Sequence, residues 1–379
     1  MEFKSYKLMR VFFLLALVFC FSCHSDPIKP LKIHFEEKNL PIGQVGVSSS
    51  KPFFFFTDSS GMYVFDEFTR TIVKFGRNEV VPKEFISFVD EDRFEVSEMQ
   101  GFIYSKFGFF FFNPNQIIHF DNEGEVKRFR LEDLIIDSTS EFLDYGYKIQ
   151  FNLTFAKTIS AFDAENNRLF FVLRKDKELK VGEYSLNSPS KVKVYDIIDN
   201  DMIDVQRIGN QFSSKISLSN AVSPILSYAN GNLMISYPFQ NSFQVFDLKT
   251  NRLLESTITS SIHPNSKEIQ YVEKNELNEF VSKIKAWNND VTFGPIYWEE
   301  ENQVYYRLVK GVSKSLNPFD GELFLSLFDS SFSLIQEEKL TEYASNLSFE
   351  YFKMDKELWI KKASPVEDEL IYHTMSLTK

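Results

Sequence analysis

The chain has 379 residues, of which 43% are hydrophobic and 25% are charged, and its formal net charge is −11. This composition excludes a disordered tail, a collagen-like fibre and a disulfide-rich scaffold. The strong negative charge provides no basic surface for a phosphate backbone, so we expect no nucleic-acid partner. Glycine is scarce, with 14 residues, whereas phenylalanine is abundant, with 42.

The first 22 residues have the features of a secretory signal peptide. Lys4, Lys7 and Arg10 form a basic segment, and an unbroken apolar run follows from Val11 to Phe21. A helix that spans a bilayer needs about 20 apolar residues. The run is therefore too short for a membrane anchor and fits the core of a signal peptide.

The apolar run ends in Cys20-Phe21-Ser22-Cys23, which resembles a bacterial lipobox. In such a motif the final cysteine is acylated and becomes the new N-terminus. We predict a signal peptide over residues 1–22, lipidation of Cys23 and a polar tether over residues 23–30. The alternative is an ordinary signal peptide that is cleaved nearby, because Cys20 stands where a lipobox usually has leucine.

Lipidation predicts the location of the protein and one of its partners. Two or more acyl chains attach a protein stably to a membrane. We therefore expect an outer-membrane lipoprotein of the cell envelope, with its periplasmic or surface face left open. Cys23 would be the only cysteine after cleavage, which excludes an internal disulfide, a thiolate nucleophile and a cysteine-ligated metal centre.

Residues 31–379 are expected to form one domain of short strands. Apolar runs alternate with turn signals in three regular units, at 51–75, 108–131 and 231–258, and in three less regular units, at 167–197, 294–340 and 348–377. Six such units predict an all-β fold, a six-bladed β-propeller. The run Leu31–Glu37 would add the last strand and close the ring. A non-propeller all-β protein, such as two stacked sandwiches, is the alternative.

Two further features refine this prediction. A sequence like a capping box at Pro264–Glu268, followed by apolar residues at helical spacing, predicts a helix over 265–287 between the fourth and fifth units. The phenylalanine runs 53–56 and 109–112 stand at equivalent points of two units. Continuous apolar runs fit strands that are covered on both faces, so we expect phenylalanine to fill the interfaces between blades.

The densest aromatic and basic group provides the candidate ligand-binding residues: Trp298, Tyr305, Tyr306 and Arg307. In a strand, Tyr305 and Arg307 point to one face and Tyr306 to the other. Aromatic rings beside an arginine suit stacking on a sugar or capture of a carboxylate. The alternative is that the rings pack between blades while Arg307 pairs with a neighbouring carboxylate.

Signals for metal or cofactor chemistry are weak. Asp196, Asp199, Asp201 and Asp204 lie within nine residues, but they lack the glycine of an EF-hand loop, so we expect a solvated acidic loop. No two of the five histidines have a metal-ligand spacing. We predict no metal and no cofactor and identify no catalytic residue, which leaves enzymatic activity undecided and favours a non-enzymatic role.

The blocks GNLMISYPFQNSFQVFD (231–247) and GPIYWEEENQVYYRL (294–308), with the lipobox-like start, resemble an uncharacterised family of Bacteroidetes lipoproteins, domain of unknown function 4221. The resemblance implies a six-bladed propeller in the cell envelope. It implies no activity, so no catalytic residue is carried over.

The sequence thus favours a lipid-anchored module that binds an unknown protein or carbohydrate. The alternative is an envelope hydrolase or lyase acting on carbohydrates or esters, with carboxylates at the propeller axis. A purely structural role in an envelope complex is a third hypothesis. The enzyme needs converging carboxylates at the axis, whereas the binding module needs an exposed aromatic patch.

Overall fold

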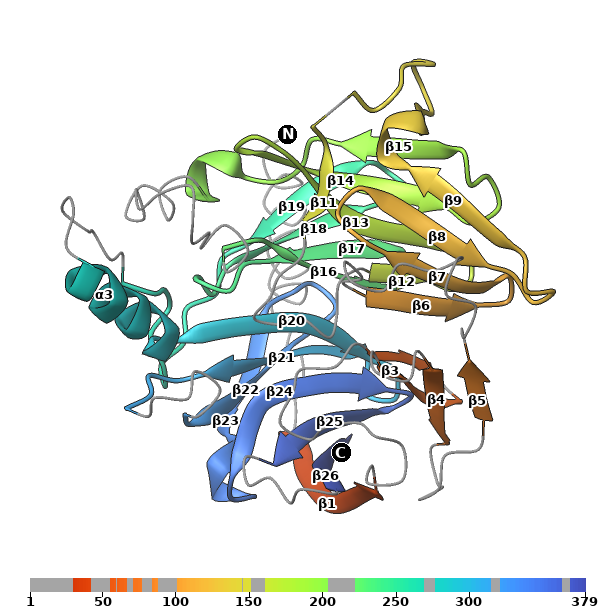
Figure 1. Cartoon of the computed structure of the whole chain (residues 1–379). Coiled ribbons are helices and arrows are strands. Elements are labelled where there is room, and N and C mark those ends of the chain that lie inside the picture. Colours follow the sequence, from red (N-terminus) through yellow and green to blue (C-terminus); the bar gives the residue numbers. More distant parts are fainter. Residues whose placement is uncertain are drawn as a thin grey trace, which may run out of the picture.

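The computed structural model in Figure 1 describes residues 30–41, 55–58, 60–66, 71–76, 84–87, 101–144, 146–150, 161–203, 222–268, 277–314, 321–362 and 369–379. The predicted signal peptide and its lipidation site, Cys23, lie outside these residues.

The described strands form six sheets, which we number as blades. Blade 1 consists of β2 (Phe55–Asp58), β3 (Gly61–Asp66), β4 (Thr71–Gly76) and β5 (Glu84–Ser87). Blade 2 consists of β6 (Gly101–Ser105), β7 (Gly108–Phe112), β8 (Gln116–Phe120) and β9 (Val126–Arg130). Blade 4 consists of β16 (Ile225–Ala229), β17 (Asn232–Ser236), β18 (Phe243–Asp247) and β19 (Arg252–Ser256). Blade 5 consists of β20 (Thr292–Glu299), β21 (Val304–Lys310), β22 (Leu323–Phe328) and β23 (Leu334–Lys339). Blade 6 consists of β24 (Leu347–Met354), β25 (Glu357–Lys362), β26 (Glu369–Thr378) and β1 (Lys32–Pro41).

Blade 3 is less regular than the others. Its first strand is split into β11 (Lys148–Gln150) and β12 (Ala161–Asp163), which both pair with β13 (Arg168–Lys175). Two long strands follow, β14 (Glu178–Ser185) and β15 (Lys191–Tyr195), and the two-residue β10 (Ile135–Ile136) adds a parallel outer edge. The described helices are η2 (Leu131–Asp133), α3 (Leu277–Asn289) and η5 (Leu340–Glu342), together with a helical turn at residues 200–203.

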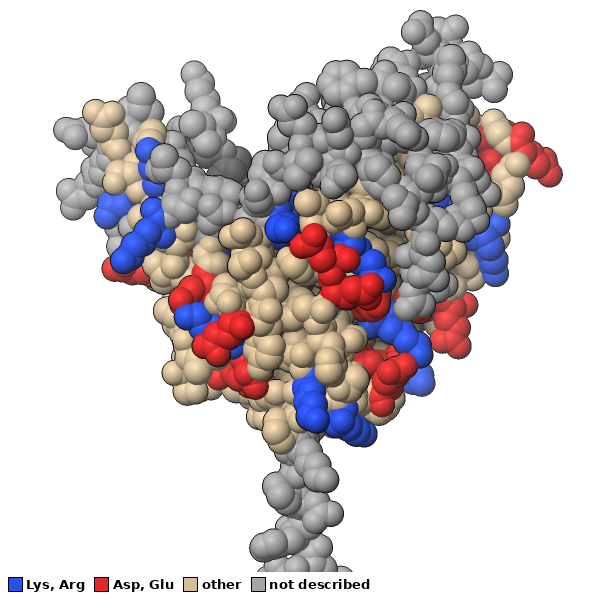
Figure 2. Space-filling view, turned by 90° about the horizontal axis from the view of Figure 1, so that it is seen from below, with Lys and Arg blue, Asp and Glu red and all other residues tan. Residues whose placement is uncertain are grey.

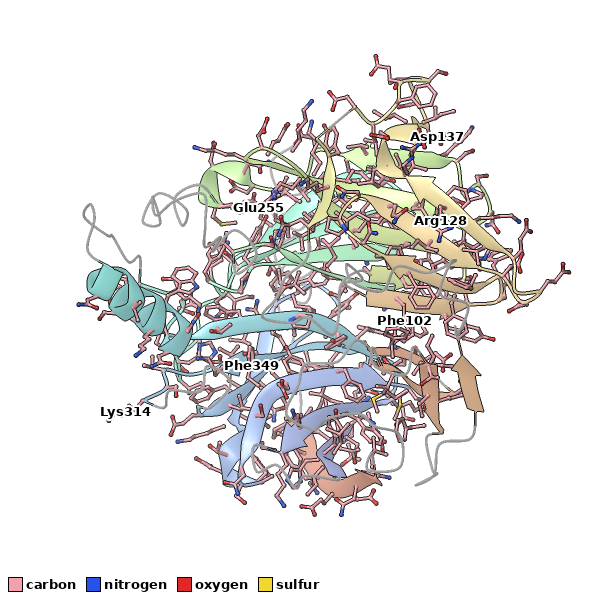
Figure 3. The ribbon with its side chains drawn as sticks, viewed as in Figure 1. Phe102, Arg128, Asp137, Glu255, Lys314 and Phe349 are labelled. Atoms are coloured by element: carbon pink, nitrogen blue, oxygen red, sulfur yellow. The ribbon has the colours of Figure 1, made fainter. Side chains whose placement is uncertain are left out.

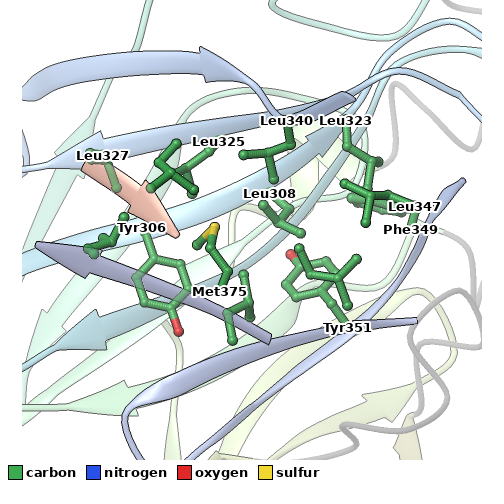
Figure 4. Close-up of a cluster of buried hydrophobic side chains, with 14 of the residues drawn as sticks. Tyr306, Leu308, Leu323, Leu325, Leu327, Leu340, Leu347, Phe349, Tyr351 and Met375 are labelled. Atoms are coloured by element: carbon green, nitrogen blue, oxygen red, sulfur yellow. The ribbon is translucent and has the colours of Figure 1, made fainter. Parts of the chain in front are cut away.

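A separate apolar cluster fills each of the six interfaces between neighbouring blades. Phe65, Phe102 and Phe111 belong to the cluster between blades 1 and 2. Tyr306 and Met375 belong to the cluster between blades 5 and 6 (Figure 4). The remaining four clusters join blades 2 and 3, 3 and 4, 4 and 5, and 6 and 1. The six blades therefore close into a ring, which confirms the predicted six-bladed propeller.

The phenylalanine run of β7 shows how these interfaces are built. Side chains alternate between the two faces of a strand. Accordingly, Phe109 and Phe111 pack towards blade 1, whereas Phe110 and Phe112 pack towards blade 3. Both faces of the strand are covered, and this confirms that phenylalanine fills the interfaces between blades.

The predicted equivalence of the runs 53–56 and 109–112 is wrong. Their described parts lie on β2, the first strand of blade 1, and on β7, the second strand of blade 2. The predicted unit at 51–75 therefore corresponds to a blade read from its first strand, whereas the unit at 108–131 corresponds to a blade read from its second strand. Successive antiparallel hairpins have similar sequence patterns, and nothing local marks the strand that lies innermost.

The first and the last described strands pair in blade 6, as the sequence predicted. β1 pairs with β26 over its whole length, from Lys32 opposite Thr378 to Pro41 opposite Glu369. In Figure 1 the red β1 lies beside the C-terminal strand at the bottom of the ring. Leu31 also exchanges two hydrogen bonds with the Gln336 side chain of blade 5, at 2.8 and 3.0 Å. Ring closure thus joins chain segments more than 300 residues apart.

The predicted helix is present between blades 4 and 5, but residues 265–268 are not part of it. Asn265 does not cap a helix, because its Oδ1 accepts hydrogen bonds from Ser260 N (2.7 Å) and Asn241 Nδ2 (3.0 Å). Polar residues of this kind favour loops and turns as well as caps. The capping-box pattern therefore marked a loop of the propeller rather than a helix start.

Two buried lysines anchor the C-terminal end of α3. Lys267 Nζ donates to Trp287 O at 2.8 Å, and Lys310 Nζ donates to Asn288 O at 2.9 Å. These carbonyl groups lie at the negative end of the helix dipole and have no partner within the helix. Burial, assisted by the nearby charge of Lys310, lowers the pKa of Lys267 to about 7.

We expect the closing strand to control global stability. Ile33→Ala removes a side chain that is only 9% exposed, and should lower the free energy of unfolding by about 2–4 kcal/mol. The neighbouring Lys32→Ala changes an exposed side chain and should have an effect below about 0.5 kcal/mol. Urea unfolding followed by circular dichroism measures both. Equal and small effects would show that β1 is dispensable.

Lys267 predicts a pH dependence of stability. The unfolded chain holds this proton up to a pKa of about 10.4, whereas the folded chain releases it near pH 7. The unfolded state therefore binds more protons in this window, and the free energy of unfolding rises with pH. Between pH 7 and 9.5, the wild type should gain on the order of 3 kcal/mol relative to Lys267→Met.

The matched control for this prediction is Lys314→Met, at an exposed lysine on the periphery of the molecule (Figure 3). It should retain the pH dependence of the wild type in urea unfolding. The same pH dependence in the wild type and Lys267→Met would contradict the burial of a titrating amine at this position.

Candidate functional site

The four predicted ligand-binding residues lie inside the propeller. Trp298 on β20 and Tyr305, Tyr306 and Arg307 on β21 are 7%, 2%, 2% and 0% exposed. Their strand alternation is as predicted, because Tyr306 packs towards blade 6 while Tyr305 and Arg307 face blade 4. They do not form an exposed patch, and their burial fits the alternative in which the rings pack between blades.

The partner of Arg307 is not the carboxylate that the sequence suggested. Its Nη2 donates to both the main-chain oxygen and Oδ1 of Asn241, in the turn before β18. The guanidinium carbon lies 5.3–5.9 Å from the ring centres of Phe243, Phe293 and Phe328, which suits a cation–π contact. Burial lowers the pKa of Arg307 to about 9, so the group stays charged at neutral pH. Arg307 therefore links blades 4 and 5.

In the described part of the acidic loop Asp196–Asp204, one carboxylate caps a helical turn. Asp199 Oδ1 accepts a hydrogen bond from Met202 N at 2.9 Å, at the start of the helical turn. Asp204 lies outside the described residues. Among the residues that the structure describes, no group of three or more His, Cys, Asp or Glu side chains could hold a metal ion.

Carboxylates recur where strands end, and they hold the turns that follow. Glu299, at the end of the first strand of blade 5, accepts hydrogen bonds from Glu301 N (2.9 Å) and Asn302 N (2.7 Å). The same arrangement occurs at Asp58, Asp121, Asp163, Asp247 and Asp329. Such side chain to backbone bonds stabilise tight turns. An aromatic residue followed by aspartate at the end of a strand therefore marks a capped turn at Asp121, Asp163, Asp247 and Asp329.

A groove of about 790 Å³ opens between blades 3 and 4, on the face where first strands turn into second strands. The turn between β12 and β13 forms one wall, and the turns after β16 and β18 form the other. The polar and aromatic side chains along it are Asp163, Glu165, Asn166, Arg168, Tyr228, Asn230 and Lys249.

Asp163 is the fixed centre of this groove. Its Oδ2 accepts hydrogen bonds from Arg168 Nε (3.0 Å) and Nη2 (2.7 Å), and also from Asn166 Nδ2 (2.9 Å). Its Oδ1 accepts from Asn166 N at 3.1 Å. Burial opposes the charged form, but the hydrogen bonds from Asn166 and Arg168 outweigh it and hold the pKa of this carboxyl below its usual range. The carboxylate is therefore ionised and immobile.

A second carboxylate, that of Glu183, also lies close to the Arg168 guanidinium. Arg168 Nη1 lies 3.7 Å from Glu183 Oε1, and Glu183 in turn accepts a hydrogen bond from the Tyr195 hydroxyl. Arg168 is thus held between two carboxylates. Because its charge is already matched, it presents a fixed set of N–H groups rather than a free cation.

The opposite wall positions Tyr228. Its ring is stacked on Phe170 of blade 3, with ring centres 5.9 Å apart and an interplanar angle of 17°. The two-residue hairpin Asn230-Gly231 follows at φ angles of 52° and 77°, as the Asn-Gly sequence favours. Burial, and then the charge of Asp163, raise the pKa of Tyr228. The groove therefore contains a rigid aromatic ring with a neutral hydroxyl.

This groove could not be recognised in the sequence. Asp163 and Arg168 look like the ends of any short hairpin, and Tyr228 is contributed by the next blade, 60 residues later. The Asn-Gly pair marks the hairpin in the sequence, but nothing marks the neighbour that faces it. Only the packing of blade 3 against blade 4 brings these side chains together.

A second hollow, of about 610 Å³, lies beside α3 and is lined by Lys267, Glu268, Asp290 and Val312 among others. Its polar groups are already used within the fold. Lys267 bonds to α3, and Asp290 Oδ2 accepts a hydrogen bond from Glu268 N at 2.6 Å. The groove between blades 3 and 4 is the larger of the two and has four exposed polar side chains, Glu165, Asn166, Asn230 and Lys249, so we regard it as the candidate site.

These features define a six-bladed β-propeller, closed by its N-terminal strand, with a polar groove between two blades. The family described as Domain of unknown function (DUF4221) matches residues 95–339. The chain therefore belongs to the DUF4221 family, as the sequence resemblance implied.

A DUF4221 member from Bacteroides vulgatus ATCC 8482, known from its crystal structure, is 14% identical, with a TM-score of 0.62 over 92% of this chain and 98% of that chain. At this identity the likeness shows the fold alone. A luciferin-regenerating enzyme (10% identity, TM-score 0.44, 90% and 95% covered) and the β-propeller domain of Myceliophteria thermophila Cps50 (Swd1) (8%, 0.40, 86% and 84%) are too dissimilar to support any argument. No curated protein matches the chain.

Burial gives Arg307 a structural role that can be measured. Arg307→Met leaves both acceptor atoms of Asn241 without their donor, and should lower the free energy of unfolding by about 2 kcal/mol or more. Tyr306→Phe is the control, because the Tyr306 hydroxyl has no hydrogen-bond partner among the described residues, and its change should stay below about 1 kcal/mol. Chemical unfolding measures both. Unchanged stability of Arg307→Met would exclude this link between blades.

Proposed function

We propose that this protein is a lipid-anchored binding module of the cell envelope and that the groove between blades 3 and 4 is its binding site. The observation that carries the proposal is the network around the buried carboxylate of Asp163, which fixes the side chains of Arg168 and Asn166 in an open groove before any ligand arrives. Preorganised polar groups of this kind favour binding, because little conformational freedom is lost when a ligand is bound.

The state of the carboxylates favours binding over the hydrolase or lyase alternative. General acid–base catalysis needs a carboxyl that can exchange its proton near the working pH. The pKa of Asp163 is lowered, and both of its oxygens accept hydrogen bonds. Other carboxylates on described first strands are also engaged, since Glu299 caps its turn and Glu350 lies 2.6 Å from Lys361. These groups act as fixed acceptors.

The membrane attachment rests on the N-terminal sequence. A tether of eight residues, 23–30, spans at most about 28 Å even when fully extended, so the lipid would hold the propeller close to the membrane. Within the described residues, no helix is long and apolar enough to cross a bilayer. On the face shown in Figure 2, acidic and basic side chains are interspersed rather than gathered into a basic patch.

The anchor is tested by Cys23→Ser. The wild type should label with radioactive palmitate in a bacterial host and sediment with membranes, whereas Cys23→Ser should lose the label and become soluble. Cys20→Leu is the matched control, because it restores the usual leucine of the motif and should retain both properties. Membrane sedimentation of Cys23→Ser, or loss of label in Cys20→Leu alone, would refute anchoring through Cys23.

A further inference from the structure

We infer that the groove between blades 3 and 4 binds a neutral carbohydrate, an inference that rests on the binding role proposed above. The charge balance of the groove, its hydrogen-bonding groups and its aromatic wall favour this class of ligand.

The charge balance excludes strong selection for an ion. Two acidic side chains, Asp163 and Glu165, and two basic ones, Arg168 and Lys249, line the groove. An anionic ligand would find Arg168 already paired with Asp163 and Glu183, and would meet the exposed carboxylate of Glu165. A cationic ligand would meet Arg168 in the same way. An uncharged polar ligand has neither conflict.

The hydrogen-bonding groups match hydroxyls. Asn166 and Asn230 carry exposed amides that both donate and accept, Arg168 only donates, and the exposed carboxylate of Glu165 only accepts. A sugar hydroxyl can donate and accept at the same time, so a ring with several hydroxyls satisfies such a mixed set. A ligand with acceptors only would leave the exposed amide oxygens of Asn166 and Asn230 without partners, which is costly once water is displaced.

The aromatic wall adds an apolar contact. Phe170 holds the Tyr228 ring in place, and the ring is half-buried at the edge of the groove. Tyrosine offers an apolar ring together with a polar hydroxyl, which suits the mixed C–H and O–H surface of a sugar. The volume of about 790 Å³ lies in the range of sites for small organic ligands and accommodates a short oligosaccharide.

The inference is tested by titration calorimetry of the detergent-solubilised, lipid-anchored protein. The neutral ligands are cellohexaose, laminarihexaose, maltohexaose, xylohexaose and mannohexaose; the charged ligands are oligogalacturonate, inorganic phosphate and spermine. We expect saturable binding of at least one neutral oligosaccharide, with an affinity that is unchanged by high salt because no net charge is involved.

Groove variants locate the site. Tyr228→Ala should weaken binding at least tenfold. Asn230→Gly keeps the left-handed backbone of the hairpin while removing the amide, and should weaken it several-fold. Val312→Ala, at the hollow beside α3, is the control and should leave the affinity unchanged. Thermal unfolding of each variant verifies that it is folded.

Several outcomes would overturn the inference. No binding of any neutral oligosaccharide, salt-sensitive binding of charged ligands alone, or neutral binding that both groove variants leave unchanged would each show that the ligand class or the site is wrong. Failure of the proposed function has a different signature. Release of new reducing ends from a bound oligosaccharide would show catalysis, and would overturn the non-catalytic role while leaving the carbohydrate class intact.

Discussion

The structure depends on the pairing of β1 with β26, because these two strands complete the blade that closes the ring. A propeller whose last blade lacks its outer strand exposes apolar surface and an unpaired edge. Blade 6 lies opposite blade 3 in the ring, so closure also constrains the two blades that form the groove. Within this ring, the packing of blade 3 against blade 4 brings Asp163 and Tyr228 together.

The six interfaces between blades explain the unusual composition. Each strand in the middle of a blade is covered on both faces, and phenylalanine supplies large apolar surfaces that pack edge to face or offset. Arg307 is a charged residue in this setting. It is accommodated because Asn241 supplies two acceptors and three aromatic rings surround the guanidinium. In the sequence, Tyr305 and Tyr306 beside Arg307 have the pattern of a ligand site. In the fold, these rings pack between blades.

Features encoded locally could be predicted from the sequence, and features created by packing could not. The six strand units, the closing strand at Leu31–Glu37 and the alternation of Tyr305 to Arg307 follow from hydrophobic period and turn signals. Two predictions were wrong: the position of the 53–56 run within its blade and the start of α3. Similar hairpin sequences occur at different strand positions of a blade, and a sequence like a capping box also occurs in a loop. The groove was missed, since Asp163 and Tyr228 become neighbours only when two blades pack.

Native-state hydrogen exchange of the β1 and β26 amides tests the closure of the ring most directly. If closure holds the fold together, the bonded amides of Ile33 to Asn39 should exchange only through global unfolding, with the same free energy as amides of the buried strand β21. Exchange of β1 at a much lower free energy, with β21 and the strands around the groove still protected, would contradict the account. In that case the N-terminal strand would be an accessory to a ring that closes without it.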